Sequence, residues 1–126
     1  MKEELMIIKC KKCNESLSQE LKLIENEATL CNKDGENVVP KGYYWIGSAR
    51  FAFTDITNKI VINTKDLRNY KPHTDDSKLS GCCGYSGIDG INLMCKNGHE
   101  IATLRCDCWM PHTVFFETNL IQQTNV

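Results

Sequence analysis

Two cysteines near the N-terminus have the spacing of a metal-binding knuckle. Cys10 and Cys13 are separated by two lysines, and this spacing lets both sulfurs reach one tetrahedral Zn²⁺ while backbone amides point at them. The positive charges of Lys11 and Lys12 favour the thiolate form that binds metal. A redox C-x-x-C would open a long helix in a βαβ unit, whereas the chain downstream is rich in strand-forming residues. The motif therefore predicts a zinc site.

The Cys10–Cys13 pair supplies only half of a four-ligand site, so the other ligands must come from elsewhere in the chain. The candidates lie in three C-terminal segments: Cys95 to His99, in which His99 is a possible fourth ligand; the adjacent Cys82 and Cys83; and Cys106 to Cys108, followed by His112. Free cysteine often behaves as a small buried hydrophobe, so we interpret Cys31 and Cys106 as core or strand residues. We expect a site built from Cys10, Cys13, Cys95 and one of Cys82, Cys83 or Cys108.

The chemistry of all eight cysteines depends on the compartment. The apolar stretch near the N-terminus, residues 5–8, is too short for a signal peptide. No apolar run approaches the roughly 20 residues that span a bilayer. We therefore expect a cytoplasmic protein with no membrane association, whose thiols stay reduced and bind metal. In a secreted protein, eight cysteines would instead allow about 105 complete disulfide pairings.

Length and charge limit the remaining classes of function. A chain of 126 residues fits one domain, residues 1–126, large enough to bury a core. Its formal net charge is −1, without the basic patch that usually supplies the affinity of nucleic-acid binders. A nucleic-acid partner is therefore disfavoured, and we expect a protein partner.

Segments rich in aromatic and β-branched residues predict a mainly β fold. The expected strands are 5–9, 43–46, 50–53, 59–63, 100–105 and 113–118. A strand that runs into the Cys10 knuckle is the zinc-ribbon arrangement, and the turn at 107–112 should join the last two strands as a hairpin. We expect a small antiparallel sheet with a zinc-ribbon-like metal site and at most one short helix.

Three other segments carry more local signals. Asn32 to Gly35 ends in Asp-Gly, which tolerates the positive φ of a tight turn, so strands should flank it. Residues 17–28 fit a helical face and a strand equally well. Residues 70–80 contain Pro72 and few apolar side chains and predict a loop.

The C-terminal third resembles a known group of sequences. Residues 81–112 contain G-C-C-G, D-G-x-N, C, G and D-C-W-x-P-H in order, and this pattern resembles a group of small, uncharacterised bacterial proteins. Residues 63–67 and His73 are also similar to that group, and the N-terminal C-x-x-C matches it more loosely. Members of the group often carry a cysteine where this chain has Asn97, which implies that a ligand is missing or replaced there. The resemblance implies a metal-bearing fold and transfers no activity.

Three functions follow from these residues. The first is a non-catalytic zinc-binding module with a structural or interaction role. The second is a zinc enzyme with an open coordination position, using His73, Asp107 or His112 as acid or base. The third is a thiol-based redox or metal sensor that uses the Cys82–Cys83 pair. No recognised hydrolase motif occurs, and His73 lies in a polar loop typical of the surface, so the first function is favoured.

Overall fold

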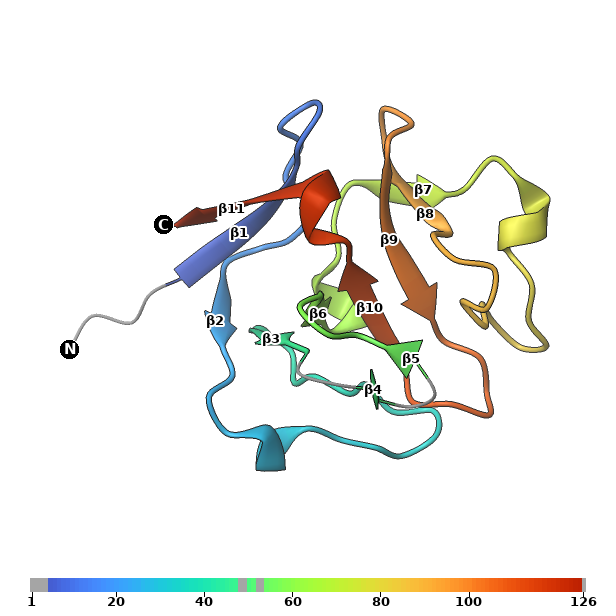
Figure 1. The fold of residues 1–126 in the computed structure, drawn as a ribbon, viewed down its shortest axis with the longest axis horizontal. Helices are drawn as coiled ribbons and strands as arrows, with labels where there is room; N and C mark the ends of the chain where they lie inside the picture. Colours follow the sequence, from blue (N-terminus) through green and yellow to red (C-terminus); the bar gives the residue numbers. More distant parts are fainter. Residues whose placement is uncertain (1–4, 48–49, 52–53, 126) are drawn as a thin grey trace.

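The protein folds around one curled β-sheet (Figure 1). The computed structural model describes residues 5–47, 50–51 and 54–125. The strands are β1 (Leu5–Cys10), β2 (Leu21–Leu23), β3 (Tyr43–Ile46), β4 (Arg50–Phe51), β5 (Thr54–Asp55), β6 (Ile60–Ile62), β7 (Tyr70–Pro72), β8 (Leu93–Cys95), β9 (Glu100–Arg105), β10 (Thr113–Phe116) and β11 (Ile121–Asn125). Nine of them form the sheet in the order β11-β1-β2-β3-β6-β10-β9-β8-β7, while β4 and β5 pair separately.

Helical structure in the described residues is limited to four 3₁₀ turns of three residues each. These are η1 (Glu27–Thr29), η2 (Thr64–Asp66), η3 (Asp76–Lys78) and η4 (Thr118–Leu120). None of the described helices has the length and apolar character needed to cross a bilayer. The expectation of a mainly β fold is therefore confirmed.

Most of the predicted strands occur close to their expected positions. β3 and β9 have the predicted ends, β1 is one residue longer than expected, and β6 and β10 are shorter. The expected strand at 50–53 is seen as far as Phe51, and residues 52–53 lie outside the described part of the chain. β9 and β10 form the predicted antiparallel hairpin, with Thr113 opposite Arg105 and Phe116 opposite Ala102.

Strand direction and two local predictions need correction. β2 and β3 are parallel, so the sheet is mixed rather than antiparallel throughout. Parallel pairing is possible here because the connection between the two strands is long enough for a crossover. Gly35 has the expected positive φ of 80°, but strands do not flank this turn. Its segment bonds to the β9–β10 connection instead, with Gly35 N–H donating to Met110 O and Val38 N–H donating to His112 O. The expected loop at 70–80 begins with β7, where Pro72 is tolerated because β7 is an edge strand.

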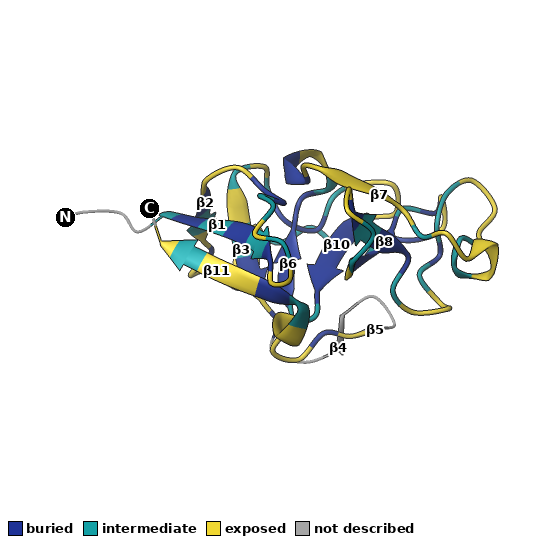
Figure 2. Ribbon diagram, turned by 90° about the horizontal axis from the view of Figure 1, so that it is seen from above, coloured by how far each residue is buried: buried dark blue, intermediate teal, exposed yellow. Residues whose placement is uncertain are grey.

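The middle of the sheet is buried on both faces. Ile60, Ile62 and Phe116 point into a core inside the curl, while Val61 and Phe115 belong to a second core on the other face. Figure 2 shows β6 and β10 in the dark blue of buried residues. Burial on both faces explains why β6 and β10 are continuous apolar runs rather than alternating ones.

The curl brings the two halves of the sheet together along a seam, which we define as residues 16–18 beside residues 67–69. Arg68 N–H donates to Leu17 O at 2.7 Å, and Asn69 Nδ2 donates to Ser16 O at 2.7 Å. β1 and β8 are far apart in the strand order. The turns that follow them nevertheless lie side by side at the top of Figure 1.

Candidate metal centre

Four potential metal ligands meet where the turn after β1 faces the turn after β8. Cys10 ends β1 and Cys13 follows its turn, while Cys95 ends β8 and His99 immediately precedes β9. The three sulfurs and the Nδ1 atom of His99 all lie within 4.8 Å of one another. Cys10 and Cys95 are buried, and Cys13 and His99 are half-buried. These four side chains, drawn from both ends of the chain, could hold a metal ion.

The distances between the ligand atoms fit a tetrahedral site. A zinc ion with bonds of about 2.3 Å to sulfur and 2.0–2.1 Å to nitrogen places two sulfurs about 3.8 Å apart, and a sulfur and a nitrogen about 3.5 Å apart. The sulfurs of Cys13 and Cys95 are 3.7 Å apart. His99 Nδ1 lies 3.7 Å from the sulfur of Cys10 and 3.3 Å from that of Cys95. The side chains therefore fit such an ion without rearrangement of the backbone.

Backbone hydrogen bonds hold the first turn in the shape that directs both sulfurs inward. Asn14 N–H donates to Cys10 O at 2.8 Å, and Cys10 N–H donates to Glu15 O at 2.9 Å. Asn14 has φ of 63°, a conformation that asparagine adopts more readily than most residues. The N–H groups of Lys12 and Cys13 also bond to the sulfur of Cys10. These amides favour the thiolate form of Cys10.

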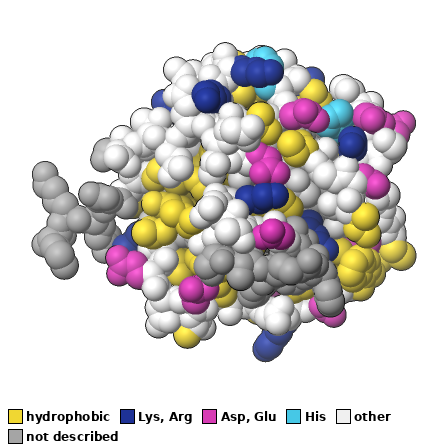
Figure 3. All heavy atoms as spheres, in the orientation of Figure 1, with side chains coloured by type: hydrophobic (Ala, Val, Ile, Leu, Met, Phe, Trp, Pro, Cys, Tyr) yellow, Lys and Arg dark blue, Asp and Glu magenta, His cyan; other side chains and the backbone are white. Residues whose placement is uncertain are grey.

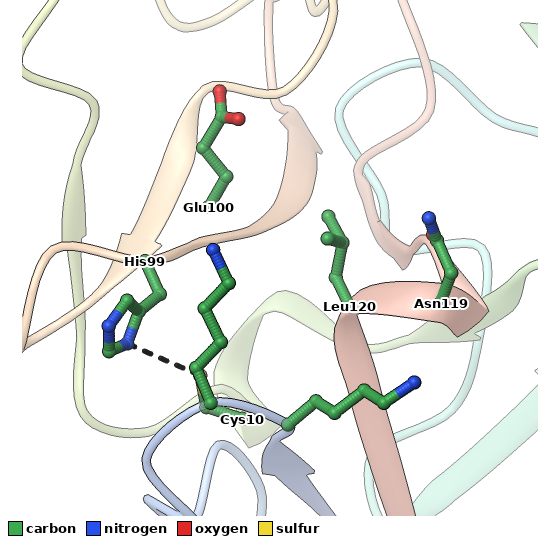
Figure 4. Close-up of a pocket in the computed structure, with 7 residues that line it drawn as sticks. Cys10, His99, Glu100, Asn119 and Leu120 are labelled. Carbon is green, nitrogen blue, oxygen red and sulfur yellow. Dashed lines mark hydrogen bonds between the residues drawn. The ribbon is translucent and has the colours of Figure 1, made fainter.

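The second turn has a matching design. Cys95 N–H donates to His99 O at 2.8 Å, and Gly98 N–H donates to Cys95 O at 2.9 Å. Gly98 has φ of 89°, which an L-residue with a Cβ rarely adopts. This tight bend brings the imidazole of His99 back over the sulfur of Cys95. Figure 4 shows the ring turned toward Cys10, while the carboxylate of the next residue, Glu100, points away.

The two thiols of the first turn differ in their electrostatics. Burial raises the pKa of Cys10, although the N–H groups of Cys13 and Lys12 offset part of this effect. A hydrogen bond from the Asn97 side chain is the largest cause that lowers the pKa of Cys13, to about 6. Cys13 is therefore mainly a thiolate at neutral pH, whereas burial favours the neutral thiol of Cys10.

Comparison of the chain with models of protein families, with curated proteins and with solved structures gave no match. The interpretation of the site therefore depends on its geometry and on the chemistry of its donors.

The other predicted ligands lie elsewhere. Cys82, Cys83 and Cys108 are exposed and form a second group, whose sulfurs also lie within 4.8 Å of one another. The structure thus brings Cys10, Cys13 and Cys95 together and places His99, rather than any of these three cysteines, in the fourth position.

The length of β9 explains this separation. His99 precedes β9 and Cys108 follows it, and six strand residues cover about 20 Å at 3.2–3.4 Å per residue. No single ion can reach both ends of such a strand. The sequence predicts this strand with the same ends. The length of the predicted strand is therefore a signal in the sequence that favours His99 over Cys108 as the partner of Cys95.

The remaining chemically active residues lie outside the four-ligand group. Cys31 and Cys106 are half-buried, and the sulfur of Cys31 donates to a carboxylate oxygen of Glu36 at 3.4 Å. His73 Nδ1 accepts from the backbone N–H of Asp75, so its Nε2–H donates to Glu100 at 2.9 Å. His73, a candidate acid or base of the enzymatic alternative, thus pairs with Glu100.

His112 lies apart from both cysteine groups. Its Nε2 atom is buried and finds no hydrogen-bond partner among the described residues. The backbone of His112 bonds to Glu36 and Val38 across the β9–β10 connection. His112 therefore lies beside Val38, a residue of the second core, and not with either group of cysteines.

A small pocket opens beside the four-ligand group (Figure 4). Its lining residues are Cys10, Lys11, Lys12, His99, Glu100, Asn119 and Leu120. The backbone of Lys11 is tied to the 3₁₀ turn η4 through a hydrogen bond from its N–H to Leu120 O. The pocket is therefore the gap between the first turn, the start of β9 and η4.

Proposed function

We propose that the protein is a zinc-stabilised module in which one Zn²⁺, bound by Cys10, Cys13, Cys95 and His99, joins the two halves of the curled sheet. The observation that carries this proposal is the meeting of four ligand atoms within 4.8 Å of one another, from turns 82 to 89 residues apart in sequence. Cys10 and Cys95 also belong to the core inside the curl, but packing alone does not require their sulfurs to converge with Cys13 and His99 on one point.

The donor set supports zinc as the metal. Three thiolates and one imidazole form one of the usual combinations of structural zinc sites, which are nearly always tetrahedral. Hard ions such as Mg²⁺ and Ca²⁺ prefer oxygen ligands, and the four-ligand group contains none. A bound dication would also favour the thiolate form of Cys10, which burial disfavours.

A structural role is favoured over a catalytic one. Catalytic zinc sites keep one coordination position for water or substrate, whereas structural sites are closed by four protein ligands. With His99 in the fourth position, the group offers a closed set. His73, the candidate acid or base of the enzymatic alternative, already shares hydrogen bonds with Glu100 and the backbone of Asp75.

The same proposal assigns the protein to a reducing compartment, the cytoplasm, and to contacts with a protein partner. Zinc thiolates persist where thiols stay reduced. Exposed hydrophobic side chains support a contact role: Leu23, Tyr43 and Ile46 are 37–45% exposed. Figure 3 shows hydrophobic side chains gathered over β2 and β3, the strands that carry these residues.

Metal content and ligand identity test the zinc proposal directly. The experiment compares the wild-type protein with the double variant Cys10→Ser/Cys13→Ser and with His99→Ala, using elemental analysis and the absorption spectrum after cobalt substitution. Cys31→Ser is the matched control, because it removes a thiol that belongs to neither cysteine group.

We expect both site variants to lose the tightly held ion and the thiolate-to-cobalt bands of a tetrahedral site. The control should keep both. A His99→Ala protein with unchanged metal affinity and an unchanged cobalt spectrum would show that the fourth ligand is not His99. A wild-type protein that purifies without zinc and takes up no cobalt would overturn the proposal.

A further inference from the structure

A second group of thiols lies at the other end of β9. Cys82 and Cys83 come from the turn at 81–84, and Cys108 comes from the β9–β10 connection. The sulfur of Cys83 lies 3.0 Å from that of Cys108 and 3.9 Å from that of Cys82. All three residues are exposed. Unlike the buried thiols of the first group, these face solvent and serve no core.

One buried carboxylate holds all three cysteines in place. Asp107 is 1% exposed, and its oxygens accept the backbone N–H groups of Cys82 at 2.9 Å, Cys83 at 3.0 Å and Cys108 at 2.8 Å. A fourth bond comes from the indole Nε1 of Trp109 at 2.9 Å. Because hydrogen bonds to an ionised carboxylate are stronger than neutral ones, Asp107 fixes the relative position of the two cysteine-bearing segments.

The turn that carries Cys82 and Cys83 is shaped by glycines on both sides. Gly81 has φ of 155°, and a Cβ there would collide with the carbonyl oxygen of Gly84. A Cβ at Gly84 would collide with the backbone of Cys106. The backbones therefore approach closely only because both positions are glycine. This close approach brings Cys83 to Cys108.

The charges of the group favour a divalent cation. Three thiolates and the Asp107 carboxylate would together carry four negative charges, of which a dication neutralises two and a monovalent cation only one. Thiolate sulfur is a soft ligand that selects thiophilic metals over Mg²⁺ or Ca²⁺. The three sulfurs lie on one exposed surface, so a bound ion would keep one coordination position open to solvent.

We propose that Cys82, Cys83 and Cys108 form a second metal site, which binds a thiophilic dication such as Zn²⁺ or Cd²⁺ through three thiolates and leaves its fourth position accessible. Asp107 is the positioning residue of this site. Because three protein ligands hold the ion at the surface, it exchanges more readily than the ion in the closed four-ligand site. An incoming thiol from solvent or from another protein can occupy the open position.

The test is a titration of the reduced protein with Cd²⁺, in a phosphine reductant that contains no thiol. The wild-type protein should hold two equivalents of metal in total, zinc and cadmium together, one of which a weak chelator removes. The triple variant Cys82→Ser/Cys83→Ser/Cys108→Ser should lose the weaker equivalent alone. The matched controls are Cys31→Ser, outside both groups, and Cys106→Ser, next to this group but not part of it; both should bind two equivalents.

Three further measurements separate loss of the site from loss of the fold. Asp107→Asn should weaken the second equivalent by about 10- to 100-fold, as expected for a residue that orients metal ligands, and leave the first unchanged. Trp109, bonded to Asp107, should change its fluorescence in step with the second equivalent. A circular dichroism spectrum that matches the wild type shows that each variant is folded.

The proposal fails if the wild-type and triple-variant proteins both bind one equivalent. It also fails if, once the reductant is removed and air is admitted as the oxidant, Cys83 and Cys108 form a disulfide that Cd²⁺ does not prevent, as shown by peptide mass spectrometry. Either result leaves the four-ligand site untouched, because that site is tested separately by Cys10→Ser/Cys13→Ser and His99→Ala.

Discussion

Removal of the metal should open the curled sheet along its seam. The four-ligand group joins the turn after β1 to the turn after β8, and these strands belong to opposite halves of the sheet. Without an ion, the sulfurs of the two turns keep only weak contacts with one another and with His99 Nδ1. We therefore expect chelation to destabilise the fold as a whole rather than only the two turns.

The contacts of the seam allow an estimate of the magnitude. Its polar contacts include two hydrogen bonds, from Arg68 and Asn69 to the backbone of residues 16–17, each of which contributes about 1 kcal/mol. Next to the seam, the solvent-accessible ion pair of Lys96 with Glu15, at 3.1 Å, contributes less than about 1 kcal/mol. Structural zinc contributes about 10 kcal/mol or more. Since small domains are stable by only about 5–15 kcal/mol, loss of the metal should remove most of the stability.

The assay is thermal and urea unfolding followed by circular dichroism, with and without EDTA, on protein of measured metal content. Cys95→Ser should unfold like the EDTA-treated wild type. Glu15→Gln is the matched control, because it weakens an ion pair next to the seam without removing a ligand, and it should lower the unfolding free energy by less than about 1 kcal/mol. An unchanged melting curve after complete metal removal would refute the reasoning, since the hydrophobic core would then suffice to close the sheet.

Further changes probe the core, a buried carboxylate and the enzymatic alternative. Phe116→Ala, at a fully buried position, should lower the unfolding free energy by about 3–5 kcal/mol in urea denaturation. Asp66→Asn should cost about 1–3 kcal/mol in the same assay, because the buried carboxylate accepts two hydrogen bonds and an amide oxygen replaces only one of its acceptor atoms. His73→Gln should leave zinc content unchanged and alter stability by less than about 1 kcal/mol, because the pair with Glu100 lies at the surface; a loss of zinc would contradict this.

Strands buried on one or both faces could be predicted from the sequence. β3 and β9 have enough aromatic or apolar residues to be recognised as strands, and β6 and β10 are short apolar runs. β11 could not be found in this way, because Ile121 is its only large apolar residue, and its existence depends on pairing with β1. β8 lies in a glycine-rich segment, and β7 contains Pro72. These strands are set by their partners rather than by their own composition.

The spacing of the cysteines in the sequence does not show which ligands share one metal ion. The motif at Cys10 and Cys13 indicates a metal site but says nothing about which downstream turn faces it. That choice follows from the curl of the sheet, which depends on long-range contacts such as the seam. A local pattern therefore predicts ligand type more readily than ligand partner.

The length of β9 limits which residues can share one metal ion, and it also keeps the two proposed metal sites apart. β9 has six residues, so the turn with Cys95 and His99 and the connection with Cys108 lie about 20 Å apart. Residues farther apart than about 7–10 Å, with no shared partner, rarely couple. The buried group can therefore hold the fold together while the exposed group gains, loses or exchanges an ion. The length of β9 thus allows a stably occupied metal site at one end of the strand and an exchangeable metal site at the other.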